Sequence, residues 1–500
     1  MPSHKSHILA IDQGTTGSTA LICDGEGRVI SRGYREIRQA YPHPGWVESN
    51  PAELVDSCIA AATEAVQKAS VSFSSIRALG ITNQRETTII WDRKTGKPVY
   101  NAIIWQCRRT APLSDALKKM GFSDIVRQKT GLPVDAYFSG TKIRWILDNI
   151  LDGKARASNG DLLFGTVDTW LIWNMTGGKA YVTDLSNASR TMLFNINTLD
   201  WDNELLAMLN IPRVILPRVI SSSELYGETK HDLFGSSIPF ASVAGDQQAA
   251  LFGEACFHNG MAKNTYGTGA FLMLNTGEEP VLSKNGMIST VAWGLNSKVT
   301  YALEGSIFIS GAAIQWLRDG LKIISSAAET EEMAQSVPDS NGVYFVPAFA
   351  GLGAPYWDMY ARGTITGITA GVNRAHIARA TLEAIAYQTR DVLEAMQADT
   401  GLKISLLKVD GGGSLNNFLM QFQSDILGIP VQRTAVADVT ALGAAYLAGL
   451  ATGMWKNISE IEKKWSAERT FEPKMPHSQR DSLYSKWKQA VESARGWAKP

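Results

Sequence analysis

Cysteine is scarce in this chain of 500 residues, and the few cysteines lie far apart. They are Cys23, Cys58, Cys107 and Cys256, and no two of them form a C-x-x-C pair. This spacing fits a reducing compartment and argues against a structural zinc site. Charge of one sign is not in excess, because Lys plus Arg and Asp plus Glu both total 48. The missing basic surplus argues against a nucleic-acid-binding protein.

Long hydrophobic runs are also missing. The most apolar stretch, residues 441–455, is too short and too rich in Ala and Gly to span a bilayer, and it predicts a buried helix packed closely against a neighbour. The polar residues 1–7 lead directly into an apolar stretch and leave no room for a signal peptide. Together with the cysteine pattern, these features predict a cytoplasmic protein without a membrane span.

The common phosphate and metal motifs are missing as well. The sequence has no G-x-x-x-x-G-K-[ST] motif, no G-x-G-x-x-G after a strand and no H-E-x-x-H. These absences exclude a P-loop protein and give no support to a dinucleotide-binding fold or a zinc protease. Any phosphate site must therefore be built differently.

The stretch of residues 8–22 suggests such a site. Apolar residues lead into Asp12, a turn rich in glycine and hydroxyl groups follows, and apolar residues return at Ala20. This pattern predicts two buried strands joined by a tight turn, with Asp12 at the C-terminal end of the first strand. Such a turn offers backbone N–H groups to a phosphate, and Asp12 could hold a Mg²⁺ that binds the same phosphate. A capped polar hairpin is the alternative for this stretch alone.

Similar turns recur later in the chain. Residues 263–274 repeat the strand, Gly-Thr turn and strand, and residues 408–417 run from a strand into three glycines. Between these turns and the first, residues 240–246 form a strand that ends at Asp246, a carboxylate free to act on a bound hydroxyl. We interpret the repeat as two like domains that share a cleft.

The predicted domain limits follow from this repeat. The boundary near Gly253 divides the chain into residues 1–253 and 254–500. The early order of three sequential strands, a helix opening at Asn50-Pro51 and a further strand is that of the ribonuclease-H-like fold of actin and hexokinase. The predicted fold class is therefore α/β, with two such domains around a central cleft. From residue 457 onward, we expect a charged surface helix without a chemical role.

Several longer blocks, in this order, resemble the FGGY carbohydrate kinases over nearly the whole chain. The resemblance implies ATP-dependent phosphorylation of glycerol to sn-glycerol 3-phosphate, with Mg²⁺ as cofactor and a homodimer or homotetramer as the assembly. A kinase for a larger polyol or ketose, and a non-catalytic nucleotide-binding or filament-forming protein of the actin type, are the alternatives. The blocks are residues 12–16, 80–86, 104–109, 164–170, 244–253, 264–269 and 349–357.

The resemblance also implies roles for individual residues. Asp246 matches the general base and Asp12 the carboxylate on the metal side. The implied glycerol-binding residues are Arg85, Glu86, Tyr137, Asp246 and Gln247, with Trp105 and Phe271 as apolar walls. The implied nucleotide contacts are Thr15, Thr16, Gly17, Thr268, Gly311, Gln315, Gly412 and Asn416. The alternatives are a surface ion pair for Arg85 and Glu86, plain core positions for the two aromatic residues and a helix cap for Asp246, while Asp410 is expected to be structural.

Two departures from the family pattern affect the phosphate turn and regulation. Family members usually carry a basic residue where this chain has Thr19, and a serine is common where it has Gly17, so one phosphate contact is expected to be weaker unless another Lys or Arg compensates. The stretch of residues 229–238 is short and has no arginine, which predicts that a sugar-bisphosphate site is missing. His231 in this stretch is a candidate for phosphorylation.

Overall fold

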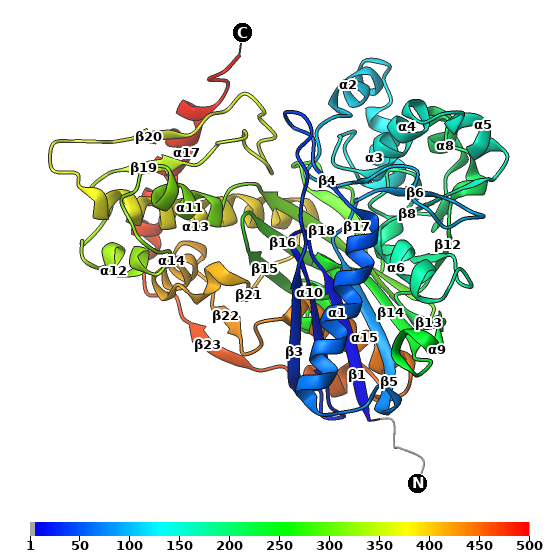
Figure 1. The fold of residues 1–500 in the computed structure, drawn as a ribbon. Helices are drawn as coiled ribbons and strands as arrows, with labels where there is room; N and C mark the ends of the chain where they lie inside the picture. Colours follow the sequence, from blue (N-terminus) through cyan, green and yellow to red (C-terminus); the bar gives the residue numbers. More distant parts are fainter. Residues whose placement is uncertain (1–5, 500) are drawn as a thin grey trace.

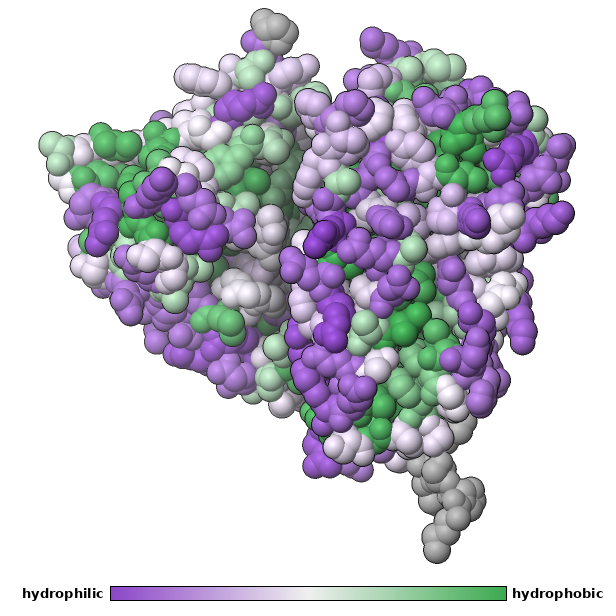
Figure 2. All heavy atoms as spheres, in the orientation of Figure 1, coloured by the Kyte–Doolittle hydropathy of each residue, from purple (hydrophilic) through white to green (hydrophobic). Residues whose placement is uncertain are grey.

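Two mixed β-sheets organise the chain, and helices cover the faces of both (Figure 1). The computed structural model describes residues 6–499. The N-terminal sheet has the strand order β13-β14-β5-β1-β2-β3, and the C-terminal sheet has the order β17-β18-β16-β15-β21-β22-β23. The space-filling view shows the surface hollowed between the two lobes that these sheets form (Figure 2). This two-domain α/β arrangement confirms the predicted fold class.

The strands of the two large sheets are short to moderate in length. In the N-terminal sheet they are β1 (His7–Gln13), β2 (Gly17–Cys23), β3 (Val29–Glu36), β5 (Ile76–Asn83), β13 (Ser223–Glu228) and β14 (Pro239–Gly245). In the C-terminal sheet they are β15 (Ala262–Tyr266), β16 (Ala270–Gly277), β17 (Ile288–Leu295), β18 (Lys298–Ile307), β21 (Leu407–Asp410), β22 (Val431–Thr434) and β23 (Ala467–Phe471). Two-stranded sheets pair β4 (Glu48–Ser49) with β7 (Ala102–Ile103), β6 (Ile89–Asp92) with β8 (Leu162–Gly165), β9 (Val182–Asp184) with β12 (Arg218–Ile220), β10 (Phe194–Asn195) with β11 (Asp200–Trp201) and β19 (Tyr344–Val346) with β20 (Thr364–Thr366).

Helices connect these strands. The first half of the chain contains α1 (Pro51–Ala69), α2 (Ala111–Lys119), α3 (Ser123–Thr130), α4 (Ser139–Asn149), α5 (Gly153–Ser158), α6 (Val167–Met175), α7 (Leu185–Ala188), α8 (Asn203–Leu209), α9 (His231–Phe234) and α10 (Asp246–Gly253). The second half contains α11 (Gly311–Asp319), α12 (Glu329–Gln335), α13 (Arg374–Thr400), α14 (Asn417–Leu427), α15 (Val439–Ala451), α16 (Ile458–Glu462) and α17 (His477–Ala494). No helix within residues 6–499 is both long and apolar enough to cross a membrane.

The predicted first hairpin is present, and its register sets the position of Asp12. Strand β1 runs antiparallel to β2, with Asp12 opposite Thr19, and parallel to β5, with Asp12 opposite Thr82. The predicted helix near residue 50 also forms, because Pro51 occupies the first turn and Asn50 accepts a hydrogen bond from the Ala52 N–H at 3.0 Å. Asp12 therefore lies near the C-terminal end of a central strand.

Helix α15 belongs to the second half of the chain but packs on the N-terminal sheet. Its buried residues share a core cluster with one face of β1 and β2, while α1 covers the opposite face. A Cβ added to Gly443 would lie 1.9 Å from the Ala249 carbonyl oxygen, and one added to Gly253 would lie 2.2 Å from the Val439 carbonyl oxygen. These glycines let the backbones of α10 and α15 approach closely, which confirms the predicted buried helix.

The C-terminal stretch contains the predicted helix, α17, together with a strand and a buried helix face that the sequence did not reveal. Residues 467–471 form β23, the edge strand that pairs with β22. Helix α17 buries Tyr484 and Trp487, which donate hydrogen bonds to the two oxygens of Asp391 at 2.6 and 2.8 Å. The sequence did not reveal this packing because the many charged residues of α17 cover its outer face, while its apolar positions complete the core of the second lobe.

Candidate active site

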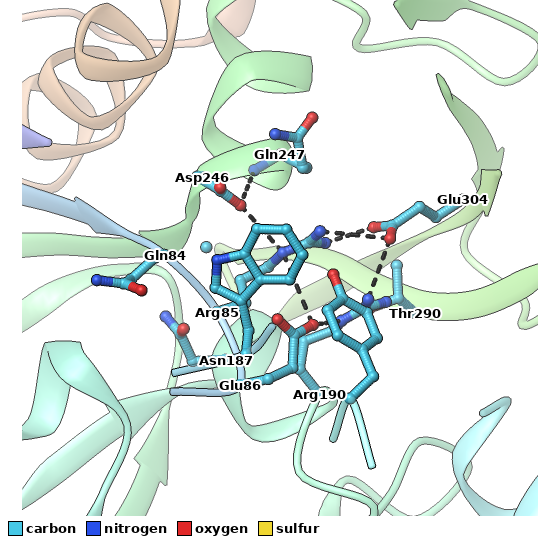
Figure 3. A network of polar contacts seen from close by, with 12 residues as sticks. Gln84, Arg85, Glu86, Asn187, Arg190, Asp246, Gln247, Thr290 and Glu304 are labelled. Carbon is cyan, nitrogen blue, oxygen red and sulfur yellow. Dashed lines mark hydrogen bonds and ion pairs between the residues drawn. The ribbon is translucent and has the colours of Figure 1, made fainter. Parts of the chain in front are cut away.

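Arg85 is the centre of a buried polar network just beyond the end of β5 (Figure 3). Its Nε lies 3.0 Å from Oδ1 of Asp246, the first residue of α10. Its terminal nitrogens donate to Glu304 of β18, and Nη1 also donates to Oε1 of Gln248 at 3.3 Å. The guanidinium therefore joins a half-buried carboxylate in one lobe to a fully buried carboxylate from the other sheet, which excludes the alternative of a surface ion pair for Arg85.

A second arginine extends this network. Arg190 donates to Oε1 of Glu86 at 2.6 Å and to Oε1 of Glu304 at 3.0 Å. Burial acts to raise the pKa of Glu304, but the neighbouring Arg190 and Arg85 charges outweigh it and lower the pKa to about 2. For Glu86 the balance is reversed, because burial raises its pKa more than the two arginines lower it. Glu304 is thus held as a carboxylate between two buried guanidinium groups.

Aromatic side chains from the first lobe lie next to this network. The rings of Trp105 and Tyr137 meet edge to face with centroids 5.7 Å apart, and the Arg190 guanidinium lies 5.7 Å from the Tyr137 ring. The indole N–H of Trp105 donates to Oγ1 of Thr15 at 2.9 Å. Trp105 therefore connects the predicted substrate wall to the predicted phosphate turn and does more than fill the core.

Phe271 is placed differently from Trp105. It lies in β16, opposite Thr265 of β15 and Ser306 of β18, and its side chain is partly exposed. Within residues 6–499 its ring makes no aromatic contact. The structure thus brings Trp105 and Tyr137 together but leaves Phe271 on the other sheet.

Gln247 faces a buried lysine. Its Oε1 accepts a hydrogen bond from Nζ of Lys263, which also donates to Oγ1 of Thr265 at 2.7 Å. Thr265 in turn donates to Oδ2 of Asp410 at 2.9 Å. Burial lowers the pKa of Lys263 and raises that of Asp410. Asp410 is therefore tied into the interior of the second lobe, in line with its expected structural role.

Asp12 lies in a region of negative charge. Burial, together with the nearby charges of Asp246 and Asp438, raises its pKa to about 8, although Arg32 opposes the rise. Within residues 6–499 no group of three or more His, Cys, Asp or Glu residues could hold a metal ion. A single carboxylate fits a Mg²⁺ whose other ligands are phosphate oxygens and water, as Mg²⁺ is usually held beside a nucleotide.

The turn between β1 and β2, which is the predicted first phosphate turn, is closed by a hydrogen bond from the Gly14 N–H to the Gly17 carbonyl oxygen at 2.9 Å. Thr16 at its tip is exposed, and Thr15 is partly exposed. Gly17 is buried, and a Cβ added there would lie 2.4 Å from the Tyr34 hydroxyl oxygen. The two threonines are thus available to a ligand, while Gly17 makes room for Tyr34.

The second turn packs against the start of α11. The N–H groups of Gly311 and Ala312 donate to the carbonyl oxygens of Gly267 and Thr268, each at 3.0 Å. A Cβ added to Gly311 would lie 2.7 Å from the Gly267 oxygen, so this approach requires glycine. Gln315, one turn further along α11, is exposed.

The third turn follows β21. Gly412 is exposed, and a Cβ added there would meet no atom within 4 Å. Asn416 caps α14 by accepting from the Leu419 N–H at 2.9 Å, and it donates to Oγ1 of Thr330 at 3.2 Å. The backbone at Gly412 is open to a ligand, whereas the Asn416 side chain already has two partners.

Comparison with known proteins supports the same two-lobed organisation. Residues 7–253 match the N-terminal domain, and residues 262–452 the C-terminal domain, of the FGGY family of carbohydrate kinases. The chain belongs to this family.

The relatives of this FGGY kinase share its length. "Glycerol kinase 2" of Thermotoga maritima is 63% identical over 99% of both chains, and "Glycerol kinase" of Caldanaerobacter subterraneus subsp. tengcongensis is 62% identical over 98% of this chain and 99% of the relative. Among solved structures, Plasmodium falciparum glycerol kinase with ADP is 37% identical, with a TM-score of 0.92 and 98% coverage of both chains. Ligand-bound xylulose kinase from Lactobacillus acidophilus shares the fold, with 22% identity, a TM-score of 0.88 and 97% coverage of both chains.

Sequence reasoning overlooked two charged residues in the network of this FGGY kinase. Glu304 directly follows the apolar run of residues 301–303 in β18, and a charge at that place is a signal that could have pointed to a buried partner. Arg190 follows a short buried helix and carried no such signal, since its partners Glu86 and Glu304 lie 104 and 114 positions away in the sequence.

Proposed function

We propose that this FGGY kinase transfers the γ-phosphoryl group of ATP to a terminal hydroxyl of glycerol and releases sn-glycerol 3-phosphate and ADP. The names of relatives that are 61–63% identical over nearly their whole length support this choice of substrate. The observation that carries the proposal is the 3.0 Å ion pair between Arg85 and Asp246, next to the edge-to-face pair of Trp105 and Tyr137. Together these groups offer a hydroxyl-binding charge pair and an apolar wall for a short polyol.

Asp246 acts as the general base in this proposal. Its carboxylate is the part of the network that solvent reaches, because its side chain is 32% exposed while that of Arg85 is 2% exposed. The Arg85 charge and the Gln247 N–H, which donates to Oδ1 at 2.7 Å, fix the orientation of the carboxylate. The free oxygen accepts the proton of the attacking hydroxyl, and positioning supplies most of the remaining catalysis in phosphoryl transfer.

Arg85, Glu86 and Gln247 hold the glycerol hydroxyls, and Tyr137, Trp105 and Phe271 bound its carbon chain. Phe271 lies on the second sheet, where its carbonyl oxygen accepts a hydrogen bond from the Lys263 amine that also donates to Gln247, and an approach of the two lobes would bring its ring closer to the substrate. Such an approach would also exclude water, which competes with glycerol for the phosphoryl group.

The nucleotide phosphates lie between the turns at Thr15 and Thr16, at Thr268 and Gly311, and at Gly412. Gln315 and Asn416 lie next to these turns, with Gln315 exposed toward a ligand and Asn416 fixing the start of α14. Asp12 would hold a Mg²⁺ bound together with ATP, and such an ion would supply charge neutralisation at the phosphate oxygens.

The test measures ADP release from Mg²⁺–ATP with and without glycerol, for the wild type and for Asp246→Asn. We expect glycerol-dependent release by the wild type and a loss of at least about 100-fold in the variant, the range that a general base contributes. Equal or faster turnover of a pentulose would favour the larger-sugar alternative. Unchanged ATP consumption by Asp246→Asn with glycerol would support a protein without kinase chemistry.

Three further features are proposed on the resemblance and the sequence pattern. They are the domain limits 1–253 and 254–500, a homodimer or homotetramer, and a cytoplasmic location. The packing of α15 on the first sheet predicts that a fragment ending at residue 253 is insoluble by itself, because the α10 and β1 surfaces lose their cover. Light scattering on the purified full chain determines the assembly.

A further inference from the structure

Three strands carry a row of side chains across the end of the N-terminal sheet. Asp12 of β1 lies opposite Thr19 of β2, and Thr19 lies opposite Tyr34 of β3. Because paired residues in neighbouring strands point to the same face, these three side chains share the face that α15 covers. The row connects the phosphate turn to the outer strand β3.

Arg32 reaches this row from the next position along that face of β3. Its Nη2 donates to Oγ1 of Thr19 at 3.3 Å, and its guanidinium lies 5.4 Å from the centroid of the Tyr34 ring. Its charge also acts on Asp12, where it opposes the surrounding carboxylates. The positively charged Arg32 of β3 therefore lies next to the uncharged side chain of Thr19.

Asp438 holds this arginine at the start of α15. Its Oδ2 lies 3.0 Å from Nε of Arg32. Asp438 occupies the N-cap position, yet its side chain makes no hydrogen bond to the N–H groups of the helix. The Arg32 side chain is 48% exposed, so nitrogens not used by Asp438 and Thr19 remain open to a ligand. Asp438 and Thr19 therefore orient the Arg32 guanidinium without burying it.

We propose that Arg32 supplies the phosphate-binding cation of the first turn, with Asp438 and Thr19 holding its guanidinium toward the nucleotide. The inference rests on the proposed nucleotide site at residues 12–17. A planar guanidinium can bind a carboxylate through one edge and a phosphate oxygen through another, which a lysine cannot do. Gly17 fits this arrangement, because its missing side chain leaves room for Tyr34 beneath the Arg32 guanidinium.

Arg35 provides a matched control on the same strand. Like Arg32, it lies in β3, is half exposed at 49% and pairs with one carboxylate. Its partner is Glu64 of α1, on the opposite face of the sheet. Replacement of Arg35 therefore removes an equivalent surface charge and leaves every side chain of the row in place, although it also removes a hydrogen bond from Nη1 to the Tyr34 backbone carbonyl oxygen at 2.7 Å.

The experiment compares Arg32→Ala, Arg32→Lys and Arg35→Ala by calorimetric titration with Mg²⁺–ADP and by steady-state kinetics. For Arg32→Ala we expect the Kd for ADP and the KM for ATP to rise about 10- to 100-fold, as for the loss of one charge-assisted hydrogen bond, with the KM for glycerol nearly unchanged. Arg32→Lys recovers part of the affinity, and Arg35→Ala behaves as the wild type. If Arg32→Ala does not fold, Arg32→Gln is measured in its place.

A double variant tests the same assignment by rescue. Adding Thr19→Arg to Arg32→Ala places a guanidinium on the neighbouring strand, and we expect it to restore most of the lost nucleotide affinity. Nucleotide affinity of Arg32→Ala equal to that of Arg35→Ala overturns the inference, and so does an equal rise in the KM for glycerol. A wild type that binds ADP but shows no glycerol-dependent turnover overturns the proposed function instead, because the titration still reports on Arg32.

Discussion

Glu304 provides the most direct test of the buried charge network. The carboxylate lies in β18 of the second sheet and is the shared partner of Arg85 and Arg190. All three side chains are at most 2% exposed, so neither arginine can turn to water when Glu304 is changed. Glu304→Gln keeps the size of the side chain but removes the charge that balances the two guanidinium groups.

The expected cost follows from burial. Removing one member of a buried ion pair destabilises a protein by about 3–5 kcal/mol, because an uncompensated charge remains in the interior. The matched control is Glu278→Gln, which removes a carboxylate 2.7 Å from Lys298 where both side chains are more than 60% exposed. For this surface pair we expect less than about 1 kcal/mol.

Two measurements separate the effect on folding from the effect on the site. Urea unfolding, followed by tryptophan fluorescence, gives the free energy of unfolding of each variant in the absence of ligands. Steady-state kinetics at saturating ATP give the KM for glycerol, which we expect to rise in Glu304→Gln because Arg85 loses the partner that fixes its orientation toward Asp246. Equal unfolding free energies for Glu304→Gln and Glu278→Gln, with an unchanged KM for glycerol, would refute the reasoning.

Three further predictions concern pH, the indole contact and helix packing. The pKa of Glu304 is lowered from 4.5 to about 2 in the folded protein. The ionised carboxylate therefore adds about 3 kcal/mol to the free energy of unfolding above pH 4.5, and this stabilisation is lost as the pH falls toward 2. Acid unfolding of Glu304→Gln should lack this pH-dependent loss. Trp105→Phe removes the donor to Thr15 and should cost about 1 kcal/mol of substrate binding, seen as a higher KM; an unchanged KM for both substrates would contradict this. Gly443→Ala should destabilise the protein by about 1–3 kcal/mol, because its new Cβ would meet the backbone of α10. Gly25→Ala is the control, because a Cβ added there has no atom within 4 Å. Equal melting temperatures for the two variants would count against the close helix contact.

Local patterns in the sequence were enough for several elements that carry the site. The apolar run into Asp12 and the glycine-rich turn after it predicted the β1–β2 hairpin, because alternation and turn chemistry are properties of neighbouring residues. The cap at Asn50 and the small residues around Gly443 likewise predicted α1 and the closely packed α15. The resemblance to the FGGY family then supplied the proposed roles of Asp246 and Arg85, which local pattern alone did not.

The partners of these residues depended on contacts between distant parts of the chain. The sequence did not reveal that Glu304 lies between Arg85 and Arg190, that Arg32 reaches Thr19 from the next strand, or that α15 covers the first sheet. Strand β23 and the buried face of α17 were missed for a related reason, because charged outer faces hid their few apolar positions.

The difference between what the sequence predicted and what only the tertiary structure revealed has a physical basis. Period, capping and turn residues act over a few positions, so the sequence by itself determined the strands, the turns and the placement of Asp12 and Asp246 at strand ends. Which charges meet in the interior is decided by how the two sheets pack, since a buried charge is stable only where an opposite charge from another segment reaches it. Only the tertiary structure therefore decided that Glu304 and Arg190 complete the network around Arg85, and that the Arg32 guanidinium reaches Thr19 beside the turn after β1.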